Sequence, residues 1–310
     1  MRILVTGGAG YIGSILVPEL LARGHAVAVL DSFRFRQSSL LDVCHHPKLE
    51  VVRGDARDRE LMARHIAGVD LIIPLAALVG APLCDKEPLE SESTNVGAVK
   101  LLLELRNPGQ KIIFPTTNSG YGIGEKGVFC TEETPLNPIS RYGRQKVEAE
   151  RLILDDANAI TLRLATVFGV SPRMRLDLLV NDFVYRAVTD RCLVLFEADF
   201  KRNYLHIRDV ARAFLHGIEN FERMKNEPYN VGLSDANLSK RELCGEIKKQ
   251  IPDFYFTEAT VGEDPDKRDY IVSNEKIERT GFKPAYSLGD GIRELIKGYR
   301  IIRGGRYANI

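Results

Sequence analysis

The sequence predicts an α/β fold built on a doubly wound parallel sheet. Short runs rich in β-branched residues and leucine alternate with segments whose apolar residues have helical spacing. The links between them are short, and the first run ends in a glycine-rich turn. This alternation is typical of parallel strands whose crossover helices cover both faces of the sheet. A length of 310 residues is enough for one large domain with a smaller appendage.

Composition narrows the classes of partner. Hydrophobic residues make up 44% and charged residues 27%, which argues against long disorder. A balance of 43 basic and 42 acidic residues favours a small charged ligand over nucleic acid or a membrane surface. The five cysteines are widely separated and form no C-x-x-C pair, so neither a disulfide framework nor a metal site is expected. With no signal-peptide pattern and no apolar run of about 18 residues, we expect a cytoplasmic protein.

The first predicted strand, Arg2–Thr6, runs directly into the turn Gly7-Gly8-Ala9-Gly10-Tyr11-Ile12-Gly13. Apolar residues with helical spacing follow as far as Gly24, and a second strand, 26–30, ends at Asp31. Glycines let a pyrophosphate approach a helix N-terminus, and a strand-end aspartate accepts hydrogen bonds from the adenosine ribose. The order of these elements therefore predicts a dinucleotide site in a Rossmann-like fold, against the alternative of a purely structural turn.

The acid that ends the second strand bears on the choice of cofactor. Asp31 repels a ribose 2′-phosphate, which favours NAD over NADP. Arg34 and Arg36 follow closely, however, and keep NADP as an alternative.

Strands and helices continue to alternate in the first half of the chain. We expect strands at Leu49–Arg53, 70–75 and 111–115, and helices at 57–67 and 93–105. Ligands of such sheets bind at the carboxyl ends of the strands. Those ends hold Asp31, Asp55, Ala76 and the loop 116–122.

The later chain changes character and brings scattered arginines and chain breakers. We expect strands at 161–167, 193–196 and 228–231, and helices at 180–188, 209–222, 239–250 and 288–302. We infer a dinucleotide-binding domain over 1–168 and a mainly substrate-binding region over 169–310. The two are interleaved, because no clean linker separates them.

Tyr142 and Lys146 are the candidate catalytic pair. On a helix they are four residues apart and share one face, where the ammonium favours the phenolate. Tyr142 could then take a proton near neutral pH. Alone, the pattern is weak, since an exposed helix pair has the same spacing. About 25 residues earlier, the loop Thr116-Thr117-Asn118-Ser119-Gly120-Tyr121-Gly122 leaves the sheet. Its Thr117 hydroxyl could hold the oxygen that Tyr142 deprotonates, although turn formers alone would also explain the loop.

These pieces together resemble the extended short-chain dehydrogenase/reductases that act on nucleotide-sugars, over nearly the whole chain. The matching motifs are Thr6-Gly7-x-x-Gly10-x-x-Gly13, Asp31, Gly54-Asp55, Leu75-Ala76-Ala77, Asn95-Val96-Gly97, the Thr117 loop, Tyr142-x-x-x-Lys146, and Arg202-Asn203-Tyr204-Leu205-His206-Ile207-Arg208-Asp209. The resemblance implies a homodimer paired through helices near 93–105 and 141–155. We expect His206, in the last of these motifs, to be a packed or hydrogen-bonded structural histidine rather than an acid or a base.

The resemblance implies a bound NAD, a nucleotide-diphosphate sugar as partner, and a catalytic set of Thr117, Tyr142 and Lys146. In it, Lys146 holds the nicotinamide ribose and lowers the pKa of the tyrosine. The implied cofactor contacts are Gly7, Gly10, Tyr11, Ile12, Gly13, Asp31, Asp55, Ala56, Leu75, Ala76, Ala77, Asn95, Tyr142, Lys146 and Val167. The implied substrate contacts are Val79, Asn118, Ser119, Arg173, Arg175, Asn181, Arg202 and Arg268. For Asn181, Arg202 and Arg268, which resemble diphosphate and nucleotide contacts, a surface charge or a capped amide is the alternative.

One departure from the family narrows the reaction. The 4,6-dehydratases place Asp-Glu directly after the catalytic threonine, where water elimination needs an acid and a base. Asn118 and Ser119 stand there instead, and neither side chain titrates usefully at neutral pH. Dehydration is therefore disfavoured, which leaves hydride transfer with one proton, commonly at C4 of the sugar.

The fate of the ketone separates two enzymes. An epimerase returns the hydride to the other face of the sugar, whereas a dehydrogenase releases the ketone. Four segments, 75–84, 117–125, 171–177 and 262–270, resemble GDP-manno-heptose 4-dehydrogenases of capsule sugar synthesis and favour the second. A non-catalytic NAD-binding sensor is the rival from another class, and it would be expected to lose part of the Thr117, Tyr142 and Lys146 set.

Overall fold

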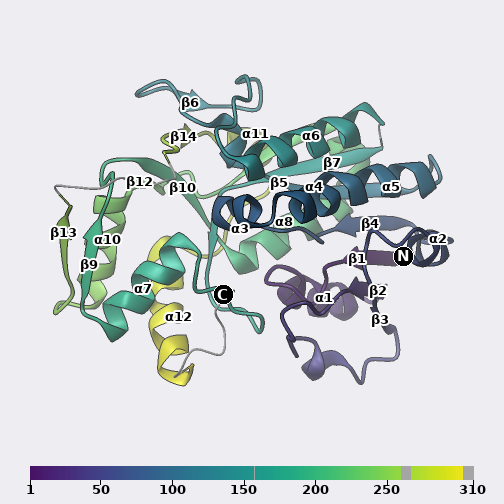
Figure 1. Cartoon of the computed structure of the whole chain (residues 1–310), viewed down its shortest axis with the longest axis horizontal. Coiled ribbons are helices and arrows are strands. Elements are labelled where there is room, and N and C mark those ends of the chain that lie inside the picture. The colour runs from purple at the N-terminus through teal and green to yellow at the C-terminus, as the bar shows by residue number, and fades with distance from the viewer. Residues whose placement is uncertain (157, 260–266, 303–310) are drawn as a thin grey trace.

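A computed structural model describes residues 1–156, 158–259 and 267–302 (Figure 1). Its centre is a seven-stranded sheet in which every paired strand is parallel. In spatial order the strands are β3 (Leu49–Arg53), β2 (Ala26–Asp31), β1 (Arg2–Thr6), β4 (Leu71–Pro74), β5 (Lys111–Thr117), β7 (Ala159–Leu164) and β11 (Glu227–Val231). The predicted doubly wound α/β fold is confirmed. The strand order reverses between β1 and β4, which is where ligands of such sheets bind.

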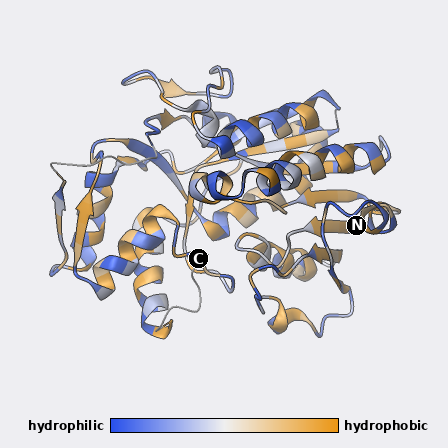
Figure 2. Cartoon of the chain, in the orientation of Figure 1, coloured by the Kyte–Doolittle hydropathy of each residue, from blue (hydrophilic) through white to orange (hydrophobic). Residues whose placement is uncertain are grey.

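Helices cover both faces of this sheet. Helices α1 (Gly13–Ala22) and α8 (Ile207–Glu219) share one buried apolar cluster with the sheet. Helices α2 (Arg59–Ile66), α5 (Ala98–Leu105) and α6 (Arg141–Asp155) share another, which includes alternate residues of the same strands. In Figure 2 the central strands are mostly hydrophobic, whereas α6 is banded in both colours. This is the pattern of a sheet buried on both faces beneath amphipathic helices.

A smaller core lies in the later chain, on the left in Figure 1. It packs helices α7 (Leu179–Thr189), α10 (Lys240–Gln250) and α12 (Leu288–Ile301) against short strands. Those strands are β8 (Thr166–Phe168), β9 (Cys192–Leu195), β10 (Lys201–His206), β12 (Asn237–Ser239) and β13 (Tyr255–Glu258). Strands β6 (Phe129–Cys130) and β14 (Ile271–Val272) form a separate parallel pair. The remaining short helices are α3 (Ala81–Lys86), α4 (Pro88–Glu92), α9 (Phe221–Met224) and α11 (Glu275–Arg279).

Two expected elements are interrupted. The predicted strand 161–167 divides at Ala165, whose amide donates to the Val231 carbonyl at 2.9 Å. Strand β7 therefore stays in the central sheet, while β8 turns away and pairs with β10. The predicted helix 93–105 begins with a π-helical turn at Ser93–Gly97 and becomes regular only in α5. Such turns re-aim side chains and are frequent at functional sites.

Candidate active site

The glycine turn connects β1 to α1 and packs closely on two neighbours. Gly7 has φ +68°, and a Cβ there would lie 2.6 Å from the Ala76 amide nitrogen at the end of β4. A Cβ at Gly13 would lie 2.3 Å from the Gly8 carbonyl oxygen. Side chains are therefore excluded at both positions. The turn brings backbone amides to the α1 N-terminus, beside the point where the strand order reverses, and so fits a pyrophosphate.

Asp31 closes the loop that follows β2. It is 6% exposed, and its carboxylate accepts hydrogen bonds from the Ala9 amide at 3.0 Å, the Phe33 amide at 2.7 Å and the Gln37 side chain at 3.1 Å. Burial raises the pKa of Asp31, while these donors oppose the rise. The carboxylate is thus fixed beside the glycine turn, as the proposed contact to a ribose requires.

Tyr11 joins the glycine turn to the later chain. Its hydroxyl donates to the Gly169 carbonyl at 2.7 Å and accepts from the Asn181 amide at 3.2 Å. Asn181, fully buried, also accepts from the Gly169 amide and donates to the Arg175 carbonyl. Both polar atoms of Asn181 are therefore engaged within the chain, which favours a packing role over the substrate contact implied by resemblance. Ile12, also in the turn, is partly buried against the apolar cluster that α1 and α8 form with the central sheet.

The segment after β4 forms the next edge of the site, with Leu75, Ala76, Ala77 and Val79 half-buried. Asn95, in the π-helical turn, accepts from the Leu78 amide at 2.8 Å and donates to its carbonyl at 2.9 Å. The side-chain amide of Asn95 also donates to the Gln145 side chain on α6 at 2.9 Å. Asn95 thus fastens this segment to the helix that carries Tyr142. Sequence reasoning missed Gln145, although it lies inside the Tyr142-x-x-x-Lys146 motif.

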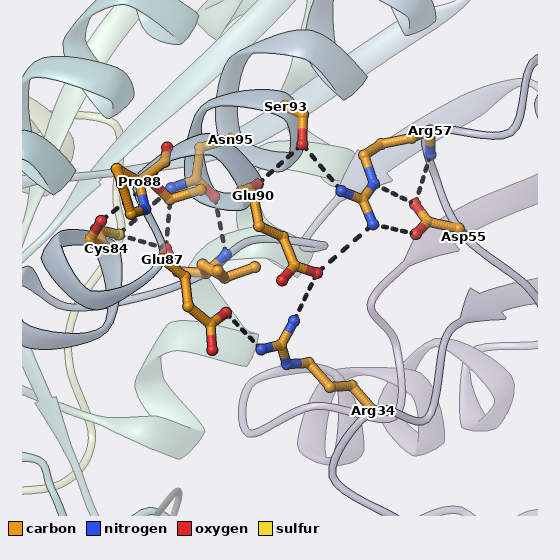
Figure 3. Close-up of polar contacts among 11 residues, drawn as sticks. Arg34, Asp55, Arg57, Cys84, Glu87, Pro88, Glu90, Ser93 and Asn95 are labelled. Atoms are coloured by element: carbon orange, nitrogen blue, oxygen red, sulfur yellow. Dashed lines mark hydrogen bonds and ion pairs between the residues drawn. The ribbon is translucent and has the colours of Figure 1, made fainter.

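At the end of β3, Asp55 is held by a single arginine. Arg57 donates to Asp55 through its amide at 2.8 Å, its Nε at 2.9 Å and its Nη2 at 2.6 Å (Figure 3). These hydrogen bonds lower the pKa of the Asp55 carboxyl. Ala56, the neighbouring candidate for adenine, is buried.

The three candidate catalytic residues come from β5 and α6, which pack against each other. Thr117 ends β5, and its hydroxyl donates to Ser119 Oγ at 2.9 Å. Tyr142 lies in the first turn of α6, which is capped by Ser140, whose Oγ accepts from the Gly143 amide at 3.0 Å. One turn later, Lys146 is 4% exposed, and its ammonium lies 3.8 Å from the centre of the Phe114 ring. Thr117, Tyr142 and Lys146 therefore belong to one region at the carboxyl end of the sheet.

The charges that act on Tyr142 differ from those expected. Burial raises the pKa of Tyr142 to about 12, and Arg175 and Arg268 are the cations that lower it. Burial also lowers the pKa of Lys146 to about 7, so this amine is neutral at the pH where such a phenol ionises. The expectation that Lys146 itself lowers the tyrosine pKa is therefore corrected. Two arginines predicted as substrate contacts have that effect instead.

The loop after Thr117 contains both engaged and unpaired polar groups. Arg268 donates to Ser119 Oγ, so Arg268, Ser119 and Thr117 form a hydrogen-bonded chain. Asn118 is 1% exposed, and neither atom of its amide has a hydrogen-bond partner among the described residues. Buried amides are normally paired, which makes Asn118 a good candidate for a ligand contact.

The other predicted substrate residues are spread over the site and its surroundings. Arg175 is paired with Asp177, with 3.1 Å between Nε and Oδ1. Arg173 lies over the Phe35 ring at 4.7 Å, next to the Asp31 loop, which places it on the cofactor side. Arg202 is 2% exposed, donates to the Lys201 carbonyl at 2.8 Å and lies 5.7 Å from the Tyr270 ring centre. Val167 is half-buried in β8.

His206 has structural partners, as expected. Its Nε2 lies 2.6 Å from Glu294 Oε2, and its Nδ1 accepts from the Arg208 amide at the start of α8.

Of the segment 262–270, residues 262–266 lie outside the described residues.

Neither a membrane span nor a metal centre is found in the part of the chain that the structure describes. No helix there is long and apolar enough to cross a bilayer. No group of three or more His, Cys, Asp or Glu side chains in the same ranges could hold a metal ion.

Comparison with known proteins gives consistent matches over most of the chain. The model of the NAD dependent epimerase/dehydratase family matches residues 3–232. The UDP-glucose 4-epimerase of Streptococcus mutans is 31% identical over 330 residues, which cover 96% of this chain and 95% of the relative. A low-salt glycan biosynthesis protein of Haloferax volcanii is 30% identical over 316 residues, covering 96% and 98%.

Solved structures agree in fold. The dTDP-glucose 4,6-dehydratase DesIV from Streptomyces venezuelae, with NAD and TYD bound, superposes with a TM-score of 0.86 at 28% identity, covering 98% of each chain. The UDP-glucose 4-epimerase of Thermotoga maritima, with UDP-glucose, has a TM-score of 0.84 at 26% identity and covers 97% of this chain and 99% of its own.

Proposed function

The chain belongs to the NAD dependent epimerase/dehydratase family, and from that premise we propose that it oxidises a nucleotide-sugar hydroxyl, at C4, with NAD as the hydride acceptor. The observation that carries the proposal is the grouping of Thr117, Tyr142 and Lys146 at the carboxyl end of the sheet that holds the glycine turn. Asn118 and Ser119 occupy the positions where a dehydratase would need an acid and a base.

The residues present fit a bound NAD. The turn at Gly7, Gly10 and Gly13 leaves no room for a Cβ at two of its positions, and Asp31 is a buried acceptor beside it. Asp55 and Ala56 would contact adenine, the segment 75–77 and Asn95 would line the middle of the site, and Val167 would lie at the carboxamide end. We propose that residues 1–168 hold the cofactor and that 169–310 mainly hold the nucleotide-sugar.

The chain's own residues handle the proton of the reaction. Oxidation of an alcohol releases a hydride, which NAD accepts, and a proton, which Tyr142 accepts as general base. Thr117 holds the reacting oxygen, and Arg175 and Arg268 favour the phenolate. Lys146 holds the nicotinamide ribose from the same helix face. Lys146 is buried, whereas the half-buried ring of Tyr142 stays accessible to a substrate.

The substrate is a nucleotide-diphosphate sugar, for which Arg202 and Arg268 supply forked donors. We propose a GDP-heptose, on the sequence resemblance of segments 75–84, 117–125, 171–177 and 262–270. The second candidate activity is 4-epimerisation, favoured by the identity with a UDP-glucose 4-epimerase. The two activities share every step up to the ketone.

A panel of GDP- and UDP-sugars separates these activities. The purified protein is incubated with each sugar and NAD, while absorbance at 340 nm, which reports NADH, and product mass are followed together. We expect a product that has lost two hydrogens, with stoichiometric NADH. An isomer of unchanged mass would instead establish the epimerase, and loss of water would contradict the reading of Asn118 and Ser119.

We also propose a homodimer, paired through α5 and α6. The two helices lie side by side and are linked by Lys100 and Glu148, whose side-chain atoms are 2.9 Å apart. Light scattering at micromolar concentration is expected to give twice the chain mass of 34.7 kDa, and a monomeric mass would contradict the proposal.

A further inference from the structure

An ion-pair cluster crosses the site from the β2 loop to α4. We call it the Arg34 cluster; its members are Arg34, Asp55, Arg57, Glu87 and Glu90 (Figure 3). Arg34 donates to Glu90 Oε1 through Nη1 at 2.6 Å and to Glu87 Oε2 through Nη2 at 2.5 Å. Arg57, bound to Asp55, lies 3.6 Å from the same oxygen of Glu90 and donates to Ser93 at 2.9 Å. Both terminal nitrogens of the Arg34 guanidinium therefore donate to carboxylates.

The ion pairs of Arg34 matter because this arginine lies close to the expected ribose contact, Asp31. The Asp31 carboxylate accepts from Phe33 and from Gln37, so the loop that contains Arg34 is closed on the residue that would bind the ribose. In this fold the acid at the end of the second strand binds the ribose of NAD, and an arginine nearby accommodates the 2′-phosphate of NADP. Arg34 instead points to α4 (Figure 3).

The net negative charge of this region opposes the binding of a ribose 2′-phosphate. Asp31 and the Arg34 cluster together contain four carboxylates and two guanidinium groups. The hydrogen bond from Arg34 lowers the pKa of Glu90, which keeps this carboxylate ionised at neutral pH. Two more arginines flank the loop, Arg53 over the Phe33 ring and Arg173 over the Phe35 ring. Any test must therefore distinguish Arg34 from them.

We propose that Glu87 and Glu90 determine cofactor specificity, because by holding Arg34 they deny a 2′-phosphate its cationic partner and so select NAD against NADP. The inference rests on the proposed binding of NAD beside Asp31. It adds two residues, 56 and 59 positions after Asp31 in the sequence, to the selection that Asp31 itself exerts. Specificity of this kind is a difference of two affinities, obtained here by withholding a contact from the wrong ligand.

The double variant Glu87→Gln/Glu90→Gln tests the proposal by isothermal titration calorimetry with NAD and NADP at fixed ionic strength. Freed from its carboxylates, Arg34 can bind the 2′-phosphate, so the affinity for NADP is expected to rise about tenfold or more. The affinity for NAD should change far less. The matched control is Glu19→Gln/Glu219→Gln, which frees Arg23 from two glutamates at 3.0 and 3.5 Å. It is expected to change neither affinity.

A triple variant assigns the gain to one residue. Adding Arg34→Met to the double variant should remove the new NADP affinity. If the gain persists, another arginine of this region, such as Arg36, Arg53, Arg57 or Arg173, receives the phosphate and the proposal is wrong. The proposal is equally wrong if the double variant gains nothing. A wild-type chain that binds no NAD would instead overturn the proposed function, which keeps the two failures apart.

Discussion

Replacing Tyr142 by phenylalanine is expected to lower kcat/KM for sugar oxidation by about a hundred- to ten-thousandfold, the usual contribution of a general base. The substitution removes one oxygen and keeps the half-buried ring in the first turn of α6. Binding of NAD, measured by calorimetry, should therefore remain intact. The matched control is Tyr255→Phe, which removes a hydroxyl from an exposed tyrosine in β13 and should keep full activity.

The pH profile provides a second readout of the same residue. Because burial holds the pKa of Tyr142 at about 12, the protonated phenol predominates at neutral pH and the base form grows as pH rises. The kcat/KM of the wild type is therefore expected to increase with pH on the alkaline side. Residual turnover in Tyr142→Phe should lack this rise. Turnover that survives near the wild-type level would exclude Tyr142 as the base, and absence of turnover in the wild type would favour the NAD-binding sensor.

Removing the Glu150 carboxylate is expected to destabilise the fold by about 3–5 kcal/mol. Glu150 on α6 and Arg163 on β7 are 3% and 5% exposed, and Arg163 Nη2 donates to Glu150 Oε1 at 2.7 Å. Arg163 also donates to the Tyr121 hydroxyl and the Glu132 carbonyl, both at 3.1 Å. In Glu150→Ala the guanidinium keeps these neutral partners but loses its counter-charge, which is the costly part of breaking a buried pair.

Denaturant unfolding at neutral pH measures this loss, and an exposed pair on α1, away from the helices proposed to form the dimer, supplies the control. Glu19 is exposed and pairs with Arg23, so Glu19→Ala should cost no more than about 1 kcal/mol. Equal losses in the two variants would show that the Glu150 pair is not effectively buried. The double substitution Glu150→Leu/Arg163→Met should recover most of the loss, because neither charge then remains buried alone.

Those parts of the molecule that depend on neighbouring residues could be predicted from the sequence. The start of the sheet is predicted by the order of elements within residues 1–31. These are strand β1, the glycine turn, helix α1 and the strand that ends at Asp31. Strand β10 was missed because its residues do not show an apolar pattern. Its Asn203 and His206 are buried with hydrogen-bond partners that include the Leu233 carbonyl and Glu294. Such partners lie far away in the sequence.

The electrostatics of the site could not be predicted from spacing either. Four residues separate Tyr142 from Lys146, which suggested a lysine that lowers the tyrosine pKa. The burial that lowers the pKa of Lys146 to about 7 depends on the packing of α6 against the sheet. The capture of Arg34 likewise joins residues 53 and 56 positions apart. Only the fold brings such groups together.

The hydrogen bonds of Tyr11 have a consequence for the order of events during translation. Tyr11 is synthesised well before Gly169 and Asn181, the two residues that pair with its hydroxyl. At elongation rates of about 5–20 residues per second, the 170 residues from Tyr11 to Asn181 take roughly ten seconds or more to synthesise. Until then the nascent chain contains the glycine turn without the two hydrogen bonds that join the Tyr11 hydroxyl to the later chain. The glycine turn therefore reaches its final structure only after much later residues have been synthesised.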